Sequence, residues 1–157
     1  MPNQAVTNAG DSQISNLATP VNSAGIVKAF ISGLPAYRQG LSAGRRGLEV
    51  GMAHGYLLVG PFTLLGPQRN TANAHVAGLL ASIGLVVILT ACLSLYASVK
   101  PGPPLTSVAV AKVPSELSTQ NGWNEFTGMF LLGGAGGAVF AWLLLSNIPM
   151  LNSLAPF

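Results

Sequence analysis

Three long apolar stretches dominate the chain, and each is long enough to cross a membrane, since about 20 apolar residues span a bilayer core. Residues 75–99 are free of Asp, Glu, Lys and Arg, and so are residues 126–147. The first stretch, 47–66, is interrupted by Glu49 and His54. This pattern predicts an all-α integral membrane protein with three transmembrane helices at 47–66, 75–99 and 126–147.

The polar and proline-rich segments divide the rest of the chain. We expect residues 1–45 to form an N-terminal segment outside the membrane, residues 46–151 the three-helix membrane domain, and residues 152–157 a short tail. Residues 1–25 are polar and poor in aromatics, so we expect them to be largely extended or disordered. Residues 100–121, rich in Pro, Ser and Thr, form the loop between the second and third helices.

Composition supports the membrane prediction. Charged residues make up 7% of the chain, against roughly 25% in soluble domains. The net charge of +3 is too weak and scattered to predict a nucleic-acid partner. The single cysteine, Cys92, lies in an apolar run, which excludes a disulfide framework and a cysteine metal site. The lipid bilayer is therefore the first partner that we predict.

The distribution of Lys and Arg predicts the orientation of the helices. Six of the seven basic residues lie before the first helix or in the loop after the second: Lys28, Arg38, Arg45, Arg46, Lys100 and Lys112. Arg69 stands alone on the other side. Because basic residues favour the cytoplasmic side, the N-terminus and the long loop should face the cytoplasm or stroma.

Glycines recur at spacings that make smooth helix surfaces. The run "GGAGGA" occupies 133–138, and Gly47, Gly51 and Gly55 are four residues apart, so they lie along one strip. Small residues allow another backbone or a flat ligand to approach closely. We expect these glycines to contact other protein; the alternative is that glycine is simply frequent in membrane helices.

Glu49 and His54 are functional candidates because lipid offers an ionisable side chain no partner. For Glu49 the alternatives are a ligand role and an ion pair with Arg45, one turn earlier on the same face. For His54 they are a ligand role and a hydrogen bond to a neighbouring carbonyl. Five positions at about 100° each place the two side chains about 140° apart around the helix. They therefore cannot share one metal ion, and as ligands they would serve two different partners.

A cofactor that takes a single axial ligand from the protein suits this arrangement, and chlorophyll is one. A haem held between His54 and His75 is unfavourable, because the two would differ in depth by roughly 20 Å in a core about 30 Å thick. The rival function is a small transporter or proton-relay subunit that uses Glu49 and His54. The other two predicted helices carry no Asp, Glu, Lys or Arg, which weighs against conduction by this chain alone.

Two long runs of sequence identify a family. The segment "TPVNSAGIVKAFISGLPAYRQGLSAGRRGLEVGMAHGYLLVGPFTLLGP", residues 19–67, resembles the signature region of photosystem I reaction-centre subunit XI, the L subunit. The similarity continues in "GWNEFTGMFLLGGAGGAVFAWLLL", residues 122–145. It covers nearly all of residues 19–147, and members of this family have three transmembrane helices.

The resemblance implies a non-catalytic accessory subunit of photosystem I in the thylakoid membrane. Through "GLEVGMAH" it implies that Glu49 and His54 are axial ligands to the magnesium of chlorophyll a, and it implies contact with beta-carotene. The implied partners are the photosystem I core, the extrinsic D subunit near the N-terminal segment, and further copies of the chain at a trimer axis. The glycines of the third helix, including Gly134 and Gly137, are expected to support that trimer contact.

The chain departs from the family after "LGP". Many cyanobacterial relatives carry an acid there, where some trimers bind calcium between monomers, but this chain has Asn70 three residues after Pro67. Hard cations favour charged oxygen ligands, so this sequence does not favour a calcium site. We expect a cyanobacterial protein, because no transit peptide is visible in the sequence.

Overall fold

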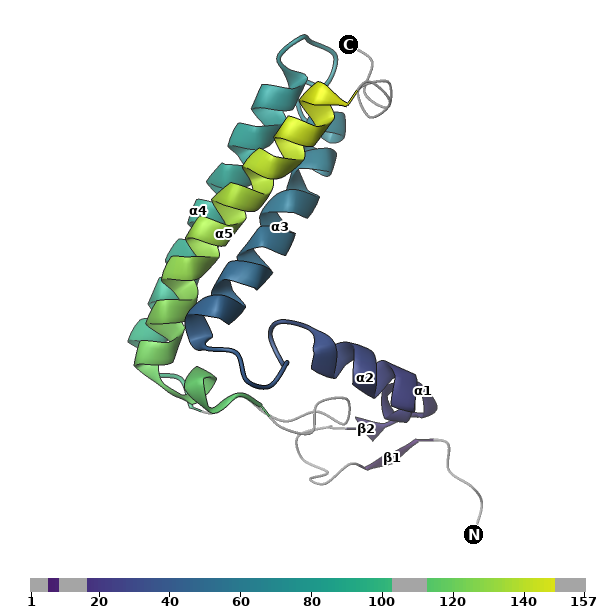
Figure 1. Cartoon of the computed structure of the whole chain (residues 1–157), viewed down its shortest axis with the longest axis vertical. Coiled ribbons are helices and arrows are strands. Elements are labelled where there is room, and N and C mark those ends of the chain that lie inside the picture. The colour runs from purple at the N-terminus through teal and green to yellow at the C-terminus, as the bar shows by residue number, and fades with distance from the viewer. Residues whose placement is uncertain (1–5, 9–16, 103–112, 149–157) are drawn as a thin grey trace.

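The computed structural model describes residues 6–8, 17–102 and 113–148 of the chain. Three long helices run side by side as one bundle (Figure 1): α3 (Ala43–Leu65), α4 (Ala74–Ser98) and α5 (Gln120–Asn147). Each is long and apolar enough to cross a membrane. The prediction of three transmembrane helices is confirmed.

Two of these helices begin several residues earlier than the apolar pattern predicts. Helix α3 begins at Ala43 rather than 47, because the Ser42 side chain accepts a hydrogen bond from the Arg45 amide at 3.2 Å. Helix α5 begins at Gln120 rather than 126, because the Thr119 side chain accepts one from the Gly122 amide at 3.1 Å. Such caps satisfy amides that lack a partner in the first helical turn. A helix can therefore start in polar sequence outside its apolar part.

Helices α3 and α5 pack backbone against backbone through glycine. A Cβ atom added at Gly47, Gly51 or Gly55 would overlap a main-chain carbonyl of α5. In return, a Cβ at Gly133 or Gly137 would overlap a main-chain carbonyl of α3. Without a hydrophobic force between helices in lipid, such close packing is what holds a pair of membrane helices together.

This packing corrects one expectation. Gly133, Gly134 and Gly137 are buried inside the subunit, so the prediction that these glycines contact another copy of the chain is wrong. A Cβ at Gly134 would lie 2.5 Å from the Val86 side chain of α4. Only Gly128 and Gly136 of this helix have open space beside them in the described part of the chain. The spacing of the glycines predicts a smooth face but does not say which helix covers it.

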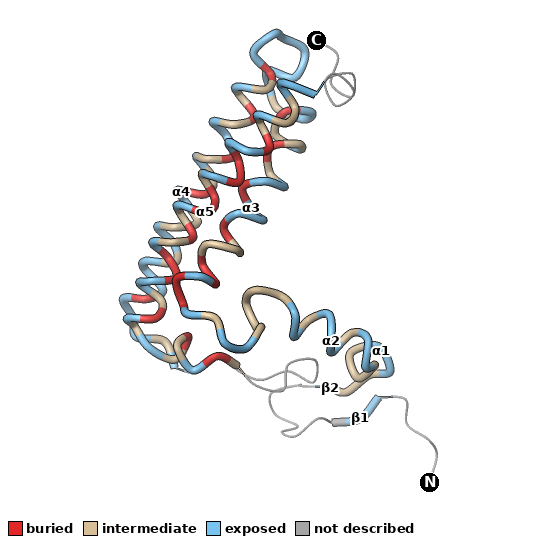
Figure 2. The backbone as a smooth tube through the Cα atoms, in the orientation of Figure 1, coloured by how far each residue is buried: buried red, intermediate tan, exposed pale blue. Residues whose placement is uncertain are grey.

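The core lies between the three helices, and their outer faces are exposed (Figure 2). One cluster is built from Val86, Phe126 and Phe130, with Leu117 below them, and a second from Val59, Ala138 and Ala141. The exposed outer faces carry large apolar side chains such as Leu80, Ile88 and Leu95 of α4. Exposed apolar surface of this kind suits a lipid environment, in agreement with the predicted membrane domain.

The N-terminal segment lies beyond one end of the bundle. Strand β1 (Thr7–Asn8) pairs antiparallel with β2 (Leu17–Ala18), and two short helices follow: α1 (Pro20–Ser23) and α2 (Gly25–Gly33). In Figure 1, α2 runs at a steep angle to the bundle.

Residues 1–25 were expected to be largely extended or disordered. This expectation is wrong from Pro20 onward, because α1 begins there. A capping box joins Thr19 and Asn22, with Pro20 in the first turn of the helix, and both features favour helix initiation. Residues 1–5 and 9–16 and the predicted tail 152–157 lie outside the described residues.

The loop between α4 and α5 ends in a single 3₁₀ turn, η2 (Ser115–Ser118). This turn lies at the same end of the bundle as the start of α3 (Figure 1). The N-terminal segment, the start of α3 and the start of α5 therefore meet in one region, which also contains Glu49.

Candidate functional site

Glu49 is held by two arginines from different parts of the chain. Its Oε2 atom accepts a hydrogen bond from Nη2 of Arg38 at 2.6 Å, and its Oε1 atom accepts one from Nε of Arg45 at 3.2 Å. The ion pair with Arg45, one of the two alternatives for Glu49, is therefore present. Arg38, which follows α2, was not predicted as a partner, because no periodicity in the sequence relates a turn residue to a helix eleven positions later.

The two ion pairs leave Glu49 able to bind a further group. A carboxylate has about four lone-pair sites, and the arginines occupy one on each oxygen. The side chain also keeps 23% of its surface exposed. The ion-pair role and the ligand role are therefore compatible at this residue, although the sequence presents them as alternatives.

A cavity of about 990 Å³ opens beside Glu49, between α3 and α5. Its walls are mostly apolar, and its charged groups are at one end: Glu49 and Arg45, next to Pro35. The other lining residues include Leu48, Met52, Tyr56, Leu57, Gly133, Gly136, Gly137 and Phe140. Two of the lining residues, Tyr56 and Phe140, form an aromatic pair with ring centres 6.2 Å apart. Together with the glycines in one wall, this pair makes the cavity suited to a large flat apolar ligand.

His54 lies on a different side of α3. It does not line this cavity, and its ring contacts Phe130 edge to face, with 5.5 Å between ring centres. The structure therefore agrees with the predicted separation of Glu49 and His54 around the helix. The two side chains open onto different surroundings, so a single ion bound by both is excluded by their placement.

The hydrogen bond of His54 determines which ring nitrogen is available. Its Nδ1 atom lies 2.8 Å from the carbonyl oxygen of Val50. A carbonyl only accepts, so Nδ1 carries the hydrogen, and in the neutral ring Nε2 then has a free lone pair. Within the described residues Nε2 has no hydrogen-bond partner, and the side chain is exposed. The carbonyl hydrogen bond expected as the alternative to a ligand role is thus present, and it leaves Nε2 as the ring nitrogen able to accept.

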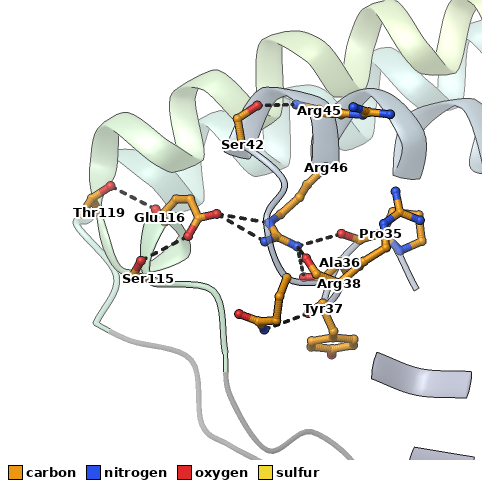
Figure 3. A network of polar contacts seen from close by, with 11 residues as sticks. Pro35, Ala36, Tyr37, Arg38, Ser42, Arg45, Arg46, Ser115, Glu116 and Thr119 are labelled. Carbon is orange, nitrogen blue, oxygen red and sulfur yellow. Dashed lines mark hydrogen bonds and ion pairs between the residues drawn. The ribbon is translucent and has the colours of Figure 1, made fainter. Parts of the chain in front are cut away.

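Arg46 was not among the predicted site residues, yet it organises this end of the bundle (Figure 3). Its side chain is only 1% exposed. Nη1 donates to the carbonyl oxygens of Arg38 at 2.6 Å, Pro35 at 3.0 Å and Ala36 at 3.4 Å. Nε and Nη2 donate to Oε1 of Glu116 at 3.4 and 3.3 Å. A buried arginine next to an exposed one in "RR" leaves no signal in composition or periodicity.

The surroundings of Glu116 lower the pKa of its carboxyl. Its own backbone amide contributes most to holding the pKa of its carboxyl below the ordinary value, partial burial opposes that effect, and Arg46 reinforces it. The carboxylate is therefore ionised under ordinary conditions and balances the charge of the buried Arg46.

The remaining predicted positions lie elsewhere. Helix α4 begins at Ala74, so His75 stands in its first turn, as expected for a residue at the interface. In the loop before α4, the Arg69 side chain donates to the carbonyl of Gly66 at 3.4 Å, so this loop presents a cation, and the neutral Asn70 does not favour calcium there. Among the described residues there is no cluster of three His, Cys, Asp or Glu side chains able to hold a metal ion.

Comparison with known proteins agrees with these features. The family model described as photosystem I reaction centre subunit XI matches residues 4–150. Proteins named photosystem I reaction center subunit XI are similar to the chain over most of both lengths. The one from Mastigocladus laminosus is 55% identical, with 92% of this chain and 83% of the relative covered. The one from Synechococcus elongatus is 55% identical, with 94% and 90% covered. The one from Crocosphaera subtropica is 58% identical, with 86% of each covered. The three apolar helices and this similarity together lead to one conclusion: the chain belongs to the photosystem I reaction centre subunit XI family.

Proposed function

We propose that this chain is a non-catalytic subunit that binds chlorophyll a through Glu49 and His54, as axial ligands to magnesium, and stabilises the assembly and trimerisation of photosystem I. The observation that carries the proposal is the hydrogen bond from Nδ1 of His54 to the Val50 carbonyl, 2.8 Å long. It leaves Nε2 with a free lone pair on the surface of a membrane helix.

Membership of the family gives the general part of this function, namely the complex and the type of membrane to which the chain belongs. As a photosystem I subunit the chain associates with other photosystem I subunits, and its three apolar helices indicate a photosynthetic membrane. A structural subunit of this kind is not an enzyme in its own right. The pigments, the thylakoid location with a cytoplasmic or stromal N-terminus, and the individual partners belong to the proposal.

The support at His54 is chemical. Histidines that bind metals commonly donate their other ring hydrogen to a carbonyl, which fixes the tautomer and the orientation of the ring. Val50 supplies that carbonyl one turn earlier in the same helix, and Phe130 packs against the ring. A chlorophyll bound at Nε2 would supply the light absorption, while the protein supplies its position and surroundings.

The support at Glu49 is the match between a carboxylate and the cavity beside it. The cavity of about 990 Å³ has apolar walls and its charged groups at the end where Glu49 lies. The macrocycle of a chlorophyll needs such apolar walls, and its magnesium accepts one carboxylate oxygen. Arg38 and Arg45 balance the negative charge of Glu49, which reduces the cost of placing it near lipid.

The rival function, a transporter or proton-relay subunit, has less support. A relay needs polar groups that contact one another along the bilayer. In α4, Ser82, Thr90 and Ser94 instead donate their hydroxyl hydrogens to carbonyls one turn earlier in the same helix. Glu49 is paired with two arginines and the ring of His54 with the Val50 carbonyl of its own helix, so in the described residues the two candidate relay groups are not connected to each other.

The proposed assembly contacts rest on exposed apolar surface and on the family. Ile26 and Phe30 of α2 are 81% and 67% exposed, and this helix runs away from the end of the bundle at a steep angle (Figure 1), which supports contact of the N-terminal segment with the extrinsic D subunit. The outer face of α4, with Leu80, Ile88 and Leu95 exposed, is available to lipid, to beta-carotene or to another copy of the chain. The buried glycines of α5 no longer support the trimer.

The experiment that tests this function measures chlorophyll content. Photosystem I purified from a strain carrying Glu49→Leu and His54→Leu should hold two fewer chlorophylls per copy of this subunit than the unaltered complex. Leucine makes both positions apolar, so the helix can still insert. An unchanged ratio of chlorophyll to subunit in the double variant would remove the basis of the proposal.

A further inference from the structure

Arg46 contacts the residues that surround Glu49 without lining the cavity itself. We propose that Arg46 is the positioning residue of the Glu49 ligand site, and that it acts through the turn formed by residues 35–38. The inference rests on the proposed role of Glu49 as a magnesium ligand. It assigns to Arg46 a role in binding one particular pigment.

One nitrogen atom of Arg46 fixes two parts of the site. Nη1 of Arg46 donates to the carbonyls of Pro35 and Arg38, at 3.0 and 2.6 Å. Pro35 lines the cavity, and the Arg38 side chain binds Glu49 at 2.6 Å. Figure 3 shows the guanidinium of Arg46 pointing into this turn. The position of the cavity wall and the position of the partner of Glu49 therefore depend on the same group.

On its opposite side, the guanidinium of Arg46 binds Glu116. Nε and Nη2 both donate to Oε1 of Glu116, in η2. A buried cation is costly unless it is paired and hydrogen-bonded, and here a carboxylate and three carbonyls meet that need. Glu116 lies in η2, which leads into the start of α5. Through its own helix α3 and through Glu116, Arg46 therefore connects the turn 35–38 to both of the helices that form the cavity.

The geometry of this position requires arginine rather than lysine. The guanidinium is a flat fork with five donors, so it can face carbonyls on one side and a carboxylate on the other. A lysine has a single nitrogen on a flexible stem. In Arg46→Lys the positive charge stays, but one nitrogen cannot hold the turn and Glu116 in this geometry at the same time. The turn should then lose its fixed position.

A purely structural role for Arg46 predicts a different result from a positioning role. If Arg46 only stabilises the fold, its replacement should lower the amount of the whole subunit and affect both pigments equally. If it positions the Glu49 site, the loss should be confined to the chlorophyll that depends on Glu49. Groups that orient a metal ligand from outside change metal binding by about 10- to 100-fold when they are altered.

The experiment uses complete photosystem I from strains carrying single substitutions in this subunit. Glu49→Leu and His54→Leu define the component of the low-temperature absorption spectrum that depends on each residue. Arg46→Lys should retain the Glu49-dependent chlorophyll about 10- to 100-fold less well during graded detergent washing, and should keep the His54-dependent component. Combined with Glu49→Leu it should cause no further loss. Arg69→Lys, in the loop before α4, is the matched control and should change neither component.

A second variant covers the case in which Arg46→Lys does not accumulate. The Arg38 side chain is 42% exposed, so Arg38→Gln should fold; it keeps the carbonyl that Arg46 binds but removes the ion pair with Glu49. It should weaken retention of the same pigment. Full retention of the Glu49-dependent component in Arg38→Gln, or equal loss of both components in Arg46→Lys, would overturn the inference. If Glu49→Leu itself removes no pigment, the proposed ligand role of Glu49 fails instead.

Discussion

Nη2 of Arg38 lies 2.6 Å from Oε2 of Glu49, and the pair joins the turn after α2 to the first half of α3. This contact connects a segment outside the proposed membrane domain to an ionisable residue at the edge of it. The charge of Glu49 is thereby balanced from the aqueous side, where arginine is readily accommodated. The N-terminal segment is therefore a structural part of the candidate site.

The glycine packing of α3 against α5 can be tested with one methyl group. A Cβ at Gly51 would overlap the carbonyl oxygen of Phe130, so Gly51→Ala should force the helices apart and destabilise the subunit by about 1–3 kcal/mol, as overpacking does. The measurement is the amount of subunit in washed membranes and the midpoint temperature of its thermal loss.

Gly60→Ala is the control in the same helix. Gly60 has open space beside it in the described structure, and alanine favours a helix over glycine by roughly 0.5–1 kcal/mol. We expect equal or slightly higher stability for this variant. If Gly51→Ala is tolerated as well as Gly60→Ala, the two backbones are not in close contact.

The ion pair of Glu116 with Arg46 predicts a loss of stability in acid. The pKa of the Glu116 carboxyl is lowered in the folded protein, first by its own backbone amide and also by Arg46. Its contribution is fully present above the ordinary pKa of 4.5 and is lost as the pH falls through the lower folded value, because the unfolded state then binds more protons. Thermal midpoints measured from neutral to acidic pH should show this loss.

Glu116→Gln should remove that part of the pH dependence. At neutral pH the variant should be less stable than the unaltered subunit, since Arg46 loses its charged partner. The difference between the two should shrink as the pH falls. A constant difference at every pH would mean that the charge of Glu116 contributes nothing to stability.

The proposed orientation makes a prediction about trypsin. Lys28 and Lys112 lie on the side predicted to be cytoplasmic or stromal, and Arg69 on the other. Trypsin added from the cytoplasmic side of intact membranes should cut at the first two and leave Arg69 protected. Cleavage at Arg69 together with protection of both lysines would show that the chain is inserted the other way.

The proposed role in trimerisation is tested by removing the subunit. Photosystem I without it should keep its photochemistry and migrate as a monomer on a native gel. Trimers that survive the deletion would place the contact elsewhere. Gly134→Leu is not a selective test of the trimer, because Gly134 is buried against Val86 and its replacement should damage the subunit itself.

Some features of the fold can be predicted from the sequence, and others cannot. Long apolar runs predict all three helices, because length and hydropathy are local properties of a segment. The spacing of Gly47, Gly51 and Gly55 is also a local property, so the sequence predicts a smooth face on the helix. Which helix packs against that face depends on the tertiary structure, and the sequence does not predict it. The capping residues Ser42 and Thr119 are visible signals that the apolar pattern does not include.

The candidate site was predicted only in part. Glu49 and His54 stand out because they interrupt an apolar helix, and Arg45 is one turn from Glu49. The roles of Arg38 and Arg46 could not be predicted in this way, since their contacts depend on how the turn 35–38 folds back onto α3 and on where η2 lies. Such contacts between distant segments have no periodic signal in a single sequence.

The most direct test of the central claim is the chlorophyll content of photosystem I carrying His54→Leu. His75→Leu is the control, because it removes a histidine from the first turn of α4, away from the proposed ligand. We predict that His54→Leu lacks one chlorophyll per copy of the subunit and has an altered low-temperature absorption spectrum, while the complex still assembles and His75→Leu keeps its full pigment. Unchanged pigment content and an unchanged spectrum in His54→Leu would contradict it.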